Sequence, residues 1–152
     1  MRITLCAFTS VDFEEGIEVY CSAFSNEPWN EQFDDLEPIR KYFERYFQYS
    51  SSFGFCAKWG NQLIGVGMGH IHPTIQGLRY YLDDFFIHPQ YQGKGVGSKL
   101  LKYIEGKCRE NNIETIVLHT LRASISEDFY KKHGFKNRSK LISLAKRFNG
   151  FK

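Results

Sequence analysis

Apolar and polar positions alternate in some stretches of the chain and recur every three or four residues in others, so each stretch predicts a strand or a helix. Residues 2–7 alternate, as in a short strand. Two stretches of helical spacing follow, separated by a break at residues 26–30. Residues 53–59 and 62–70 then predict two strands joined by a two-residue hairpin turn. Gly65, Gly67 and Gly69 share one face of the second of these strands, which indicates a large neighbour such as Trp59.

The second half of the chain predicts a third strand at 79–88, a helix at 97–110 and a buried strand near 113–120. Ser124 or Ser126 caps a last helix, which Gly134 ends. Residues 135–148 predict one or two closing strands, the clearer one at 141–145. The order β-αα-βββ-α-β-α-β(β) predicts a single mixed α/β domain over residues 1–152.

Composition narrows the class of protein. The chain has 152 residues, of which 42% are hydrophobic and 16% aromatic, as in a folded globule. The net charge of +3 is too mild to favour nucleic acid. No apolar run approaches the roughly 20 residues that span a membrane, and the first residues lack a signal-peptide core, so a cytoplasmic protein is expected. Four scattered cysteines predict buried free thiols, with no disulfide and no metal site.

The loop between the third strand and the following helix carries the sharpest local signal. Gln92-Gly-Lys-Gly-Val-Gly97 leaves backbone N–H groups unobstructed at a positively polarised helix end, beside Lys94. The spacing fits neither a mononucleotide P-loop nor a dinucleotide-binding G-x-G-x-x-G turn. A pyrophosphate would fit the loop. The structural alternative is a plain glycine-rich turn.

Two adjacent carboxylates precede this loop. Regular alternation places Asp83 and Asp84 on opposite faces of their strand, so only one of them would face a given cleft. Both could be exposed edge charges. Their aromatic and aliphatic neighbours instead suggest a carboxylate whose pKa is raised toward the range of a general base.

Other candidate residues have ordinary structural explanations. By spacing alone, Tyr130 is a core or interface tyrosine, and Trp29 either faces a substrate or covers the core. His70 and His72 lack an evident third metal ligand, so ordinary histidines are favoured over zinc.

Together these motifs resemble the GNAT superfamily of acetyl-CoA-dependent N-acetyltransferases. The family's Gln/Arg-x-x-Gly-x-Gly/Ala motif matches residues 92–97, and its Phe-Tyr-x-x-x-Gly-Phe pattern matches residues 129–135. The order of elements matches over nearly the whole chain, which implies a mostly antiparallel central sheet flanked by helices. Residues 80–101 look most like the spermidine/spermine acetyltransferase type.

The resemblance implies roles for particular residues. The backbone of residues 85–87 would pair with the pantetheine arm, N–H groups of 93–98 would hold the pyrophosphate, and an N–H near Phe86 or Ile87 would polarise the thioester carbonyl. Asp83 would accept the amine proton, with Asp84 in reserve, and Tyr130 would protonate the departing thiolate. Ala123 stands where the family often has asparagine, and Ser124 or Ser126 could compensate. The implied cofactor-binding residues are Phe85, Phe86, Ile87, Gln92, Gly93, Lys94, Gly95, Val96, Gly97, Ser98 and Ser124.

We therefore expect transfer of acetyl from acetyl-CoA to a primary amine of a small molecule, by direct attack through a tetrahedral intermediate. The acidic residues near the break at 26–30 favour a cationic acceptor such as a polyamine or an aminoglycoside, with Trp29 as a further contact, although a solvated face would account for them equally well. They are Glu27, Glu31, Asp34 and Asp35. The alternatives are a peptide N-acetyltransferase and a non-catalytic acyl-CoA-binding domain. Residues 141–145 could serve as the partner strand of a homodimer.

Overall fold

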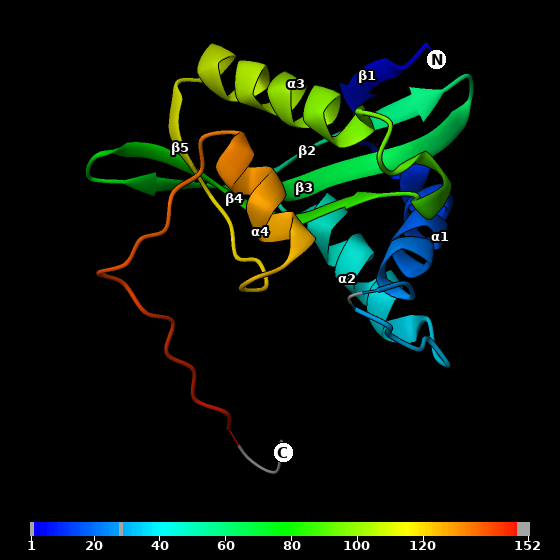
Figure 1. The fold of residues 1–152 in the computed structure, drawn as a ribbon. Coiled ribbons are helices and arrows are strands. Elements are labelled where there is room, and N and C mark those ends of the chain that lie inside the picture. Colours follow the sequence, from blue (N-terminus) through cyan, green and yellow to red (C-terminus); the bar gives the residue numbers. More distant parts are fainter. Residues whose placement is uncertain (1, 28, 149–152) are drawn as a thin grey trace. The chain divides into compact units, whose positions relative to one another are not determined.

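The computed structural model describes residues 2–27 and 29–148, which cluster into two compact units, Met1–His119 and Thr120–Lys152. The first unit contains a five-stranded sheet in the order β1-β2-β3-β4-β5 (Figure 1). Its strands are β1 (Thr4–Ala7), β2 (Ser52–Trp59), β3 (Gln62–Thr74), β4 (Gly77–Ile87) and β5 (Ile113–Val117). β1 to β4 pair antiparallel, whereas β5 runs parallel to β4. The predicted mixed, mostly antiparallel sheet is therefore confirmed.

Helices cover both faces of this sheet. In Figure 1, α3 (Val96–Glu110) lies along one face, and α1 (Phe13–Phe24) and α2 (Glu37–Gln48) lie on the other. A short 3-10 turn, Ser10–Asp12, leads into α1, and a second one, Pro89–Tyr91, leads toward α3. Each helix presents an apolar stripe to the sheet, as the helical spacing predicted.

The layer under α1 and α2 is rich in aromatic rings. Phe43 is fully buried at its centre and meets the ring of Tyr20 edge-on, with the centroids 5.8 Å apart. Met68 and Phe86 contribute to the same layer from β3 and β4. These contacts explain why apolar residues recur at helical spacing in both helices.

Two glycines of β3, Gly65 and Gly67, lie against α3 and β4. A Cβ at Gly67 would lie 2.5 Å from Cδ1 of Ile104, and one at Gly65 would lie 2.7 Å from Cδ1 of Ile87. The crowding predicted from the glycine pattern is therefore present. The neighbour is not Trp59, which is 47% exposed, but the helix and the next strand.

A β-bulge interrupts the pairing of β3 with β4. Met68 pairs with Asp84 and the next residue, Gly69, pairs with Leu82, so Asp83 is an extra residue on β4. A Cβ at Gly69 would overlap the carbonyl of Tyr81, so this close approach requires glycine. The bulge changes the direction of the two carboxylates.

The second unit holds one helix, α4 (Ile125–Lys132), among its described residues. Ser124 is its N-cap, as predicted, and accepts a hydrogen bond from the N–H of Glu127. The expected closing strands are wrong: residues 135–148 form no strand. The apolar side chains of Leu141 and Ile142 are 62% and 80% exposed, so alternation here is not matched by a pairing partner or a buried face.

Two smaller predictions can be compared with the structure. The four cysteines are free thiols, but only Cys56 and Cys108 are buried. Among the helices that the structure describes, none combines the length and the apolar character needed to cross a bilayer. The single-domain organisation stays a prediction.

Candidate active site

Asp83 and Asp84 contact groups on the same side of the sheet, so the prediction of opposite faces is wrong. Asp84 accepts a hydrogen bond from the hydroxyl of Tyr42, which lies on α2. Asp83 contacts His70, whose ring lies 5.8 Å from the ring of Tyr46, also on α2. The bulge is the physical reason, because one extra residue breaks the alternation of side chains along β4.

Burial makes Asp84 an unusual carboxylate. It raises the pKa of Asp84 from 3.8 to about 6, against the hydrogen bond from Tyr42, which lowers it. The neighbouring charge of Asp83 raises the pKa further and His70 lowers it. Asp84 therefore holds a proton more readily than an ordinary aspartate while remaining mostly ionised at neutral pH.

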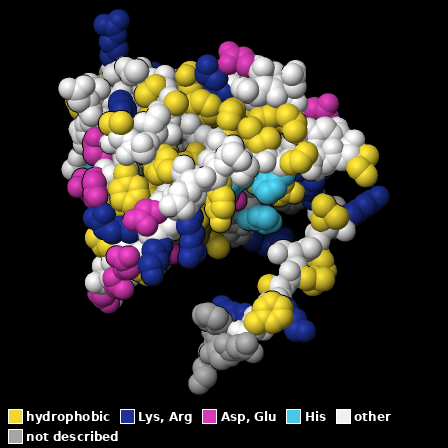
Figure 2. Space-filling view, turned by 180° about the vertical axis from the view of Figure 1, so that it is seen from behind, with side chains coloured by type: hydrophobic (Ala, Val, Ile, Leu, Met, Phe, Trp, Pro, Cys, Tyr) yellow, Lys and Arg dark blue, Asp and Glu magenta, His cyan; other side chains and the backbone are white. Residues whose placement is uncertain are grey.

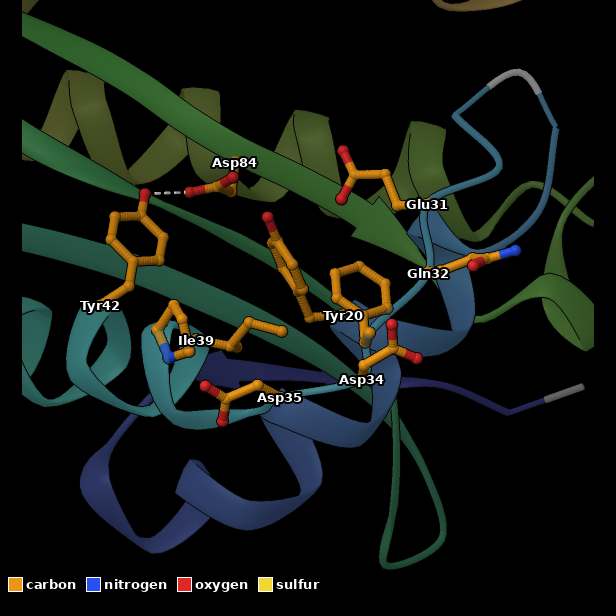
Figure 3. Close-up of a pocket in the computed structure, with 10 residues that line it drawn as sticks. Tyr20, Glu31, Gln32, Asp34, Asp35, Ile39, Tyr42 and Asp84 are labelled. Atoms are coloured by element: carbon orange, nitrogen blue, oxygen red, sulfur yellow. Dashed lines mark hydrogen bonds between the residues drawn. The ribbon is translucent and has the colours of Figure 1, made fainter. Parts of the chain in front are cut away.

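The two tyrosines beside Asp84 stay protonated, and one of them, Tyr42, donates a hydrogen bond to it. Burial raises the pKa of Tyr20 to about 12, and the charge of Asp84 adds to this shift. Burial also raises the pKa of Tyr42, again assisted by Asp84. Figure 3 shows both hydroxyl groups pointing toward the Asp84 carboxylate. Near neutral pH they stay protonated.

Asp84 lies in the wall of a pocket of about 610 Å³ (Figure 3). Tyr20 and Phe33 supply aromatic walls, and α2 supplies Ile39 and Tyr42. Three further carboxylates come from the segment between α1 and α2: Glu31, Asp34 and Asp35. Figure 2 shows acidic side chains gathered at one end of its face, the end at which α1 and α2 lie in Figure 1. Three of the four acidic residues predicted for a cationic acceptor thus line one pocket with Asp84.

The glycine-rich loop has the backbone that an anion site needs. Gly93 and Gly95 have φ angles of 73° and 82°, and a Cβ at either position would meet open space. Gly95 is the N-cap of α3 and provides no side-chain cap for the first N–H groups of that helix. Gln92 donates from Nε2 to the carbonyl of Ile87, 3.0 Å away, and so connects this loop to the end of β4. Lys94 lies over the ring of Tyr91, with its Nζ 5.7 Å from the centroid.

The sheet also opens beside this loop. β4 pairs with β5 from Leu78 to Tyr81 and continues to Ile87, so beyond Tyr81 the described residues give β4 only β3 as a neighbouring strand. An extended molecule could add to this edge as a strand would. Residues 85–87, predicted to pair with a pantetheine arm, lie in this part of β4.

The remaining predicted residues lie elsewhere. Tyr130 is on α4, in the second unit, and its ring lies 5.5 Å from that of Phe135. Ser124 donates to the carbonyl of Leu121 and caps α4, so its hydroxyl has a structural role. Trp29 packs on Phe24, with centroids 5.3 Å apart, and neither it nor Glu27 is among the residues that line the pocket. The described residues contain no cluster of three or more potential metal ligands.

Solved structures share this fold. A ribosomal-protein-alanine N-acetyltransferase from Brucella melitensis biovar Abortus 2308 superposes with a TM-score of 0.76 and 18% identity, over 97% of this chain and 100% of that one. The aminoglycoside N-acetyltransferase AAC(6')-Iy, bound to the bisubstrate analogue CoA-S-monomethyl-acetylneamine, gives a TM-score of 0.76 at 16% identity, also over 97% and 100%. The two names state different acceptors, so the similarity identifies an acetyltransferase fold and not an acceptor.

The sequence identifies the family itself. The pattern of the Acetyltransferase (GNAT) family matches residues 14–135. Because the match covers most of the chain, this protein belongs to that family. A thialysine N-epsilon-acetyltransferase from Sus scrofa is 37% identical over 46 residues, which is 30% of this chain and 27% of that protein. The match thus spans about a quarter of that relative's length.

Proposed function

We propose that this protein transfers acetyl from acetyl-CoA to a primary amine of a small, positively charged molecule. The observation that carries the proposal is the pocket in which Asp84, with a pKa of about 6, lies with three further carboxylates. Such a pocket attracts an ammonium group and provides a carboxylate that can take its proton.

The acceptor is inferred from the charge and size of the pocket. Glu31, Asp34 and Asp35 line it, and among the residues that the structure describes no lysine or arginine does. A volume of about 610 Å³ lies within the range of small-molecule sites, which is roughly 300 to 1,000 Å³. Polyamines and aminoglycosides both carry several ammonium groups, and thialysine acetylation by the pig relative is also acetylation of an amine.

We assign the general base to Asp84, in preference to Asp83. An alkylamine has a pKa near 10 and is mostly ammonium at neutral pH, so a nearby base must take its proton before it can attack. Asp84 lines the pocket and has the raised pKa, whereas the Asp83 side chain is 42% exposed and bonded to His70. Asp83 then has a supporting role.

The acetyl donor is assigned to the glycine loop and the open edge of β4. N–H groups at the start of α3 would hold the pyrophosphate, since Gly93 and Gly95 let the backbone approach it closely. The backbone of residues 85–87 would align the pantetheine arm, and Tyr130 would return a proton to the departing thiolate. Acetyl-CoA supplies the activated acyl group. The cysteines have no part in this scheme.

A thiol-release assay with acetyl-CoA tests the proposal. The acceptor panel comprises polyamines, aminoglycosides, amino acids and basic peptides. We expect the fastest release with the small polycations and a loss of about 100-fold or more in kcat/KM for Asp84→Asn. Asp34→Asn removes a binding carboxylate of the same pocket but not the base, so it should raise KM for the acceptor and leave kcat nearly unchanged. A clear preference for peptides would replace the small-molecule acceptor, and binding of acetyl-CoA without release by any amine would indicate a non-catalytic domain.

A further inference from the structure

The bulge at Asp83 brings two like charges, those of Asp83 and Asp84, to the same side of the sheet. It turns two neighbouring carboxylates toward one side of the sheet, where each disfavours the charge of the other. Asp84 has the hydroxyl of Tyr42 as a donor. The partner of Asp83 is His70, one residue beyond Gly69 on the opposing strand, where it pairs with Tyr81.

The contact between His70 and Asp83 indicates which ring nitrogen of His70 carries the hydrogen. Nδ1 of His70 lies 2.9 Å from Oδ2 of Asp83. An ionised carboxylate only accepts hydrogen bonds, so Nδ1 carries the hydrogen. Nε2 is buried and has no hydrogen-bond partner among the described residues. Nδ1 of His70 is therefore the donor to Asp83, and Nε2 makes no bond among the described residues that would compete with this orientation.

Aromatic side chains hold the imidazole in this orientation. The rings of Tyr46 and Tyr49 lie 5.8 and 5.9 Å from it at steep angles, and the ring of His72 lies 6.4 Å away. The side chain of His70 is only 21% exposed. Other titratable groups surround the pair, and they come from α1, from α2 and the residue after it, and from β3 and β4. They are Tyr20, Tyr42, Tyr46, Tyr49, His72, Tyr80, Tyr81 and Asp84.

We propose that His70 is a positioning residue, whose bond to Asp83 holds that carboxylate and leaves Asp84 as the one that takes the proton from the acceptor amine. This role rests on the proposed function. The imidazole N–H draws the charge of Asp83 toward itself and fixes the carboxylate away from Asp84. Asp84 stays ionised at neutral pH because the hydrogen bond from His70 weakens the repulsion that the charge of Asp83 exerts on it.

The proposal predicts that two substitutions shift the pKa of Asp84 in opposite directions. His70→Phe keeps a ring among the tyrosines but removes the donor, so the full charge of Asp83 acts on Asp84 and the pKa of Asp84 rises. Asp83→Asn removes the charge, so the pKa of Asp84 falls. In the double variant Asp83 is no longer charged, so removing His70 should not change the pKa of Asp84 further. That pKa should match the value in Asp83→Asn alone.

The experiment is a carbon-13 NMR titration of the Asp84 side-chain carboxyl in the full chain. It needs no substrate, so it succeeds or fails independently of the proposed activity. We expect a rise of about one unit for His70→Phe and a fall of about one unit for Asp83→Asn. His72→Phe is the matched control, because its ring is on the same strand, contacts Tyr81 and His70, and has no carboxylate partner in the described part of the chain.

Three results would overturn the role of His70. They are an unchanged Asp84 titration in folded His70→Phe, shifts of the same sign in the two single variants, and an equal shift in His72→Phe. If acetyl transfer is found, the acid limb of the kcat/KM profile should move with the NMR value in each variant. A His70→Phe enzyme that is inactive at every pH, with Asp84 titrating as before, would make His70 itself the base.

Discussion

Replacing Asp84 with asparagine is expected to stabilise the folded protein at neutral pH while it abolishes efficient turnover. The magnitude follows from the pKa of Asp84, which burial raises from 3.8 to about 6. Each unit corresponds to about 1.4 kcal/mol, so the ionised carboxylate costs the native state at most about 3 kcal/mol. Partial contact with solvent reduces this value, and about 2 kcal/mol is a realistic expectation.

The sign of the pH dependence is fixed by the direction of the shift. Between pH 3.8 and about 6 the folded protein keeps a proton on Asp84 that the unfolded chain has lost. The unfolded state then binds fewer protons, so stability falls as pH rises through this window and is constant above it with respect to this group. Asparagine does not titrate, so the advantage of Asp84→Asn should grow across the same window.

Urea unfolding, followed by the fluorescence of Trp29 and Trp59, measures this difference from about pH 4 to about pH 7.5. Asp34→Asn makes the same chemical change at an exposed position of the pocket and should alter stability little. An Asp84→Asn variant whose advantage over the wild type is equal at both ends of the range would refute the raised pKa. A variant less stable than the wild type near pH 7.5 would show that the bond from Tyr42 outweighs the burial of the charge.

Three other substitutions test separate parts of the structure. Tyr130→Phe should lower kcat by about 100-fold and leave the affinity for acetyl-CoA unchanged; equal turnover in the two proteins would remove the proposed acid. Gly95→Ala, at a φ of 82°, should weaken acetyl-CoA binding about tenfold or more in calorimetry, whereas Gly106→Ala, in open space within α3, should not. Asp12→Asn should cost about 2 to 3 kcal/mol in urea unfolding because its buried carboxylate pairs with a lysine, whereas Glu14→Gln breaks an exposed pair and should change stability little.

Much of the fold was predictable because local periodicity coincides with burial. Phe43 and Tyr46 recur on one face of α2 and are buried there. The turn between β2 and β3 lies at Gly60, where the hairpin was predicted. The same reasoning failed for residues 135–148, where Leu141 and Leu144 are exposed. Alternation shows that a strand is compatible with a segment, but a strand forms only where another strand or a packed face is available.

The site was predictable in its parts but not in its arrangement. The glycine loop was predicted because glycine at alternate positions directly indicates an unusual backbone conformation. The acidic segment after α1 was predicted from charge alone. The common direction of Asp83 and Asp84 was missed because alternation assumes one-to-one pairing of strands. Gly69 was the available signal: a glycine inside a strand often marks a bulge or a close backbone approach.

The acidic pocket favours binding of an ammonium group and, for the same reason, opposes its deprotonation, because negative charge stabilises the cation. Under the proposed function this conflict is removed if the proton goes to Asp84 and not to water. Transfer from the amine to Asp84 leaves the total charge of pocket and acceptor unchanged, so the other carboxylates affect the step only through small differences in distance. The transfer stays uphill because an alkylammonium has a pKa near 10, and the raised pKa of Asp84 lowers its cost. The bulge at Asp83, which places both carboxylates on the side of α2, is in this view the backbone feature that adjusts the strength of the base.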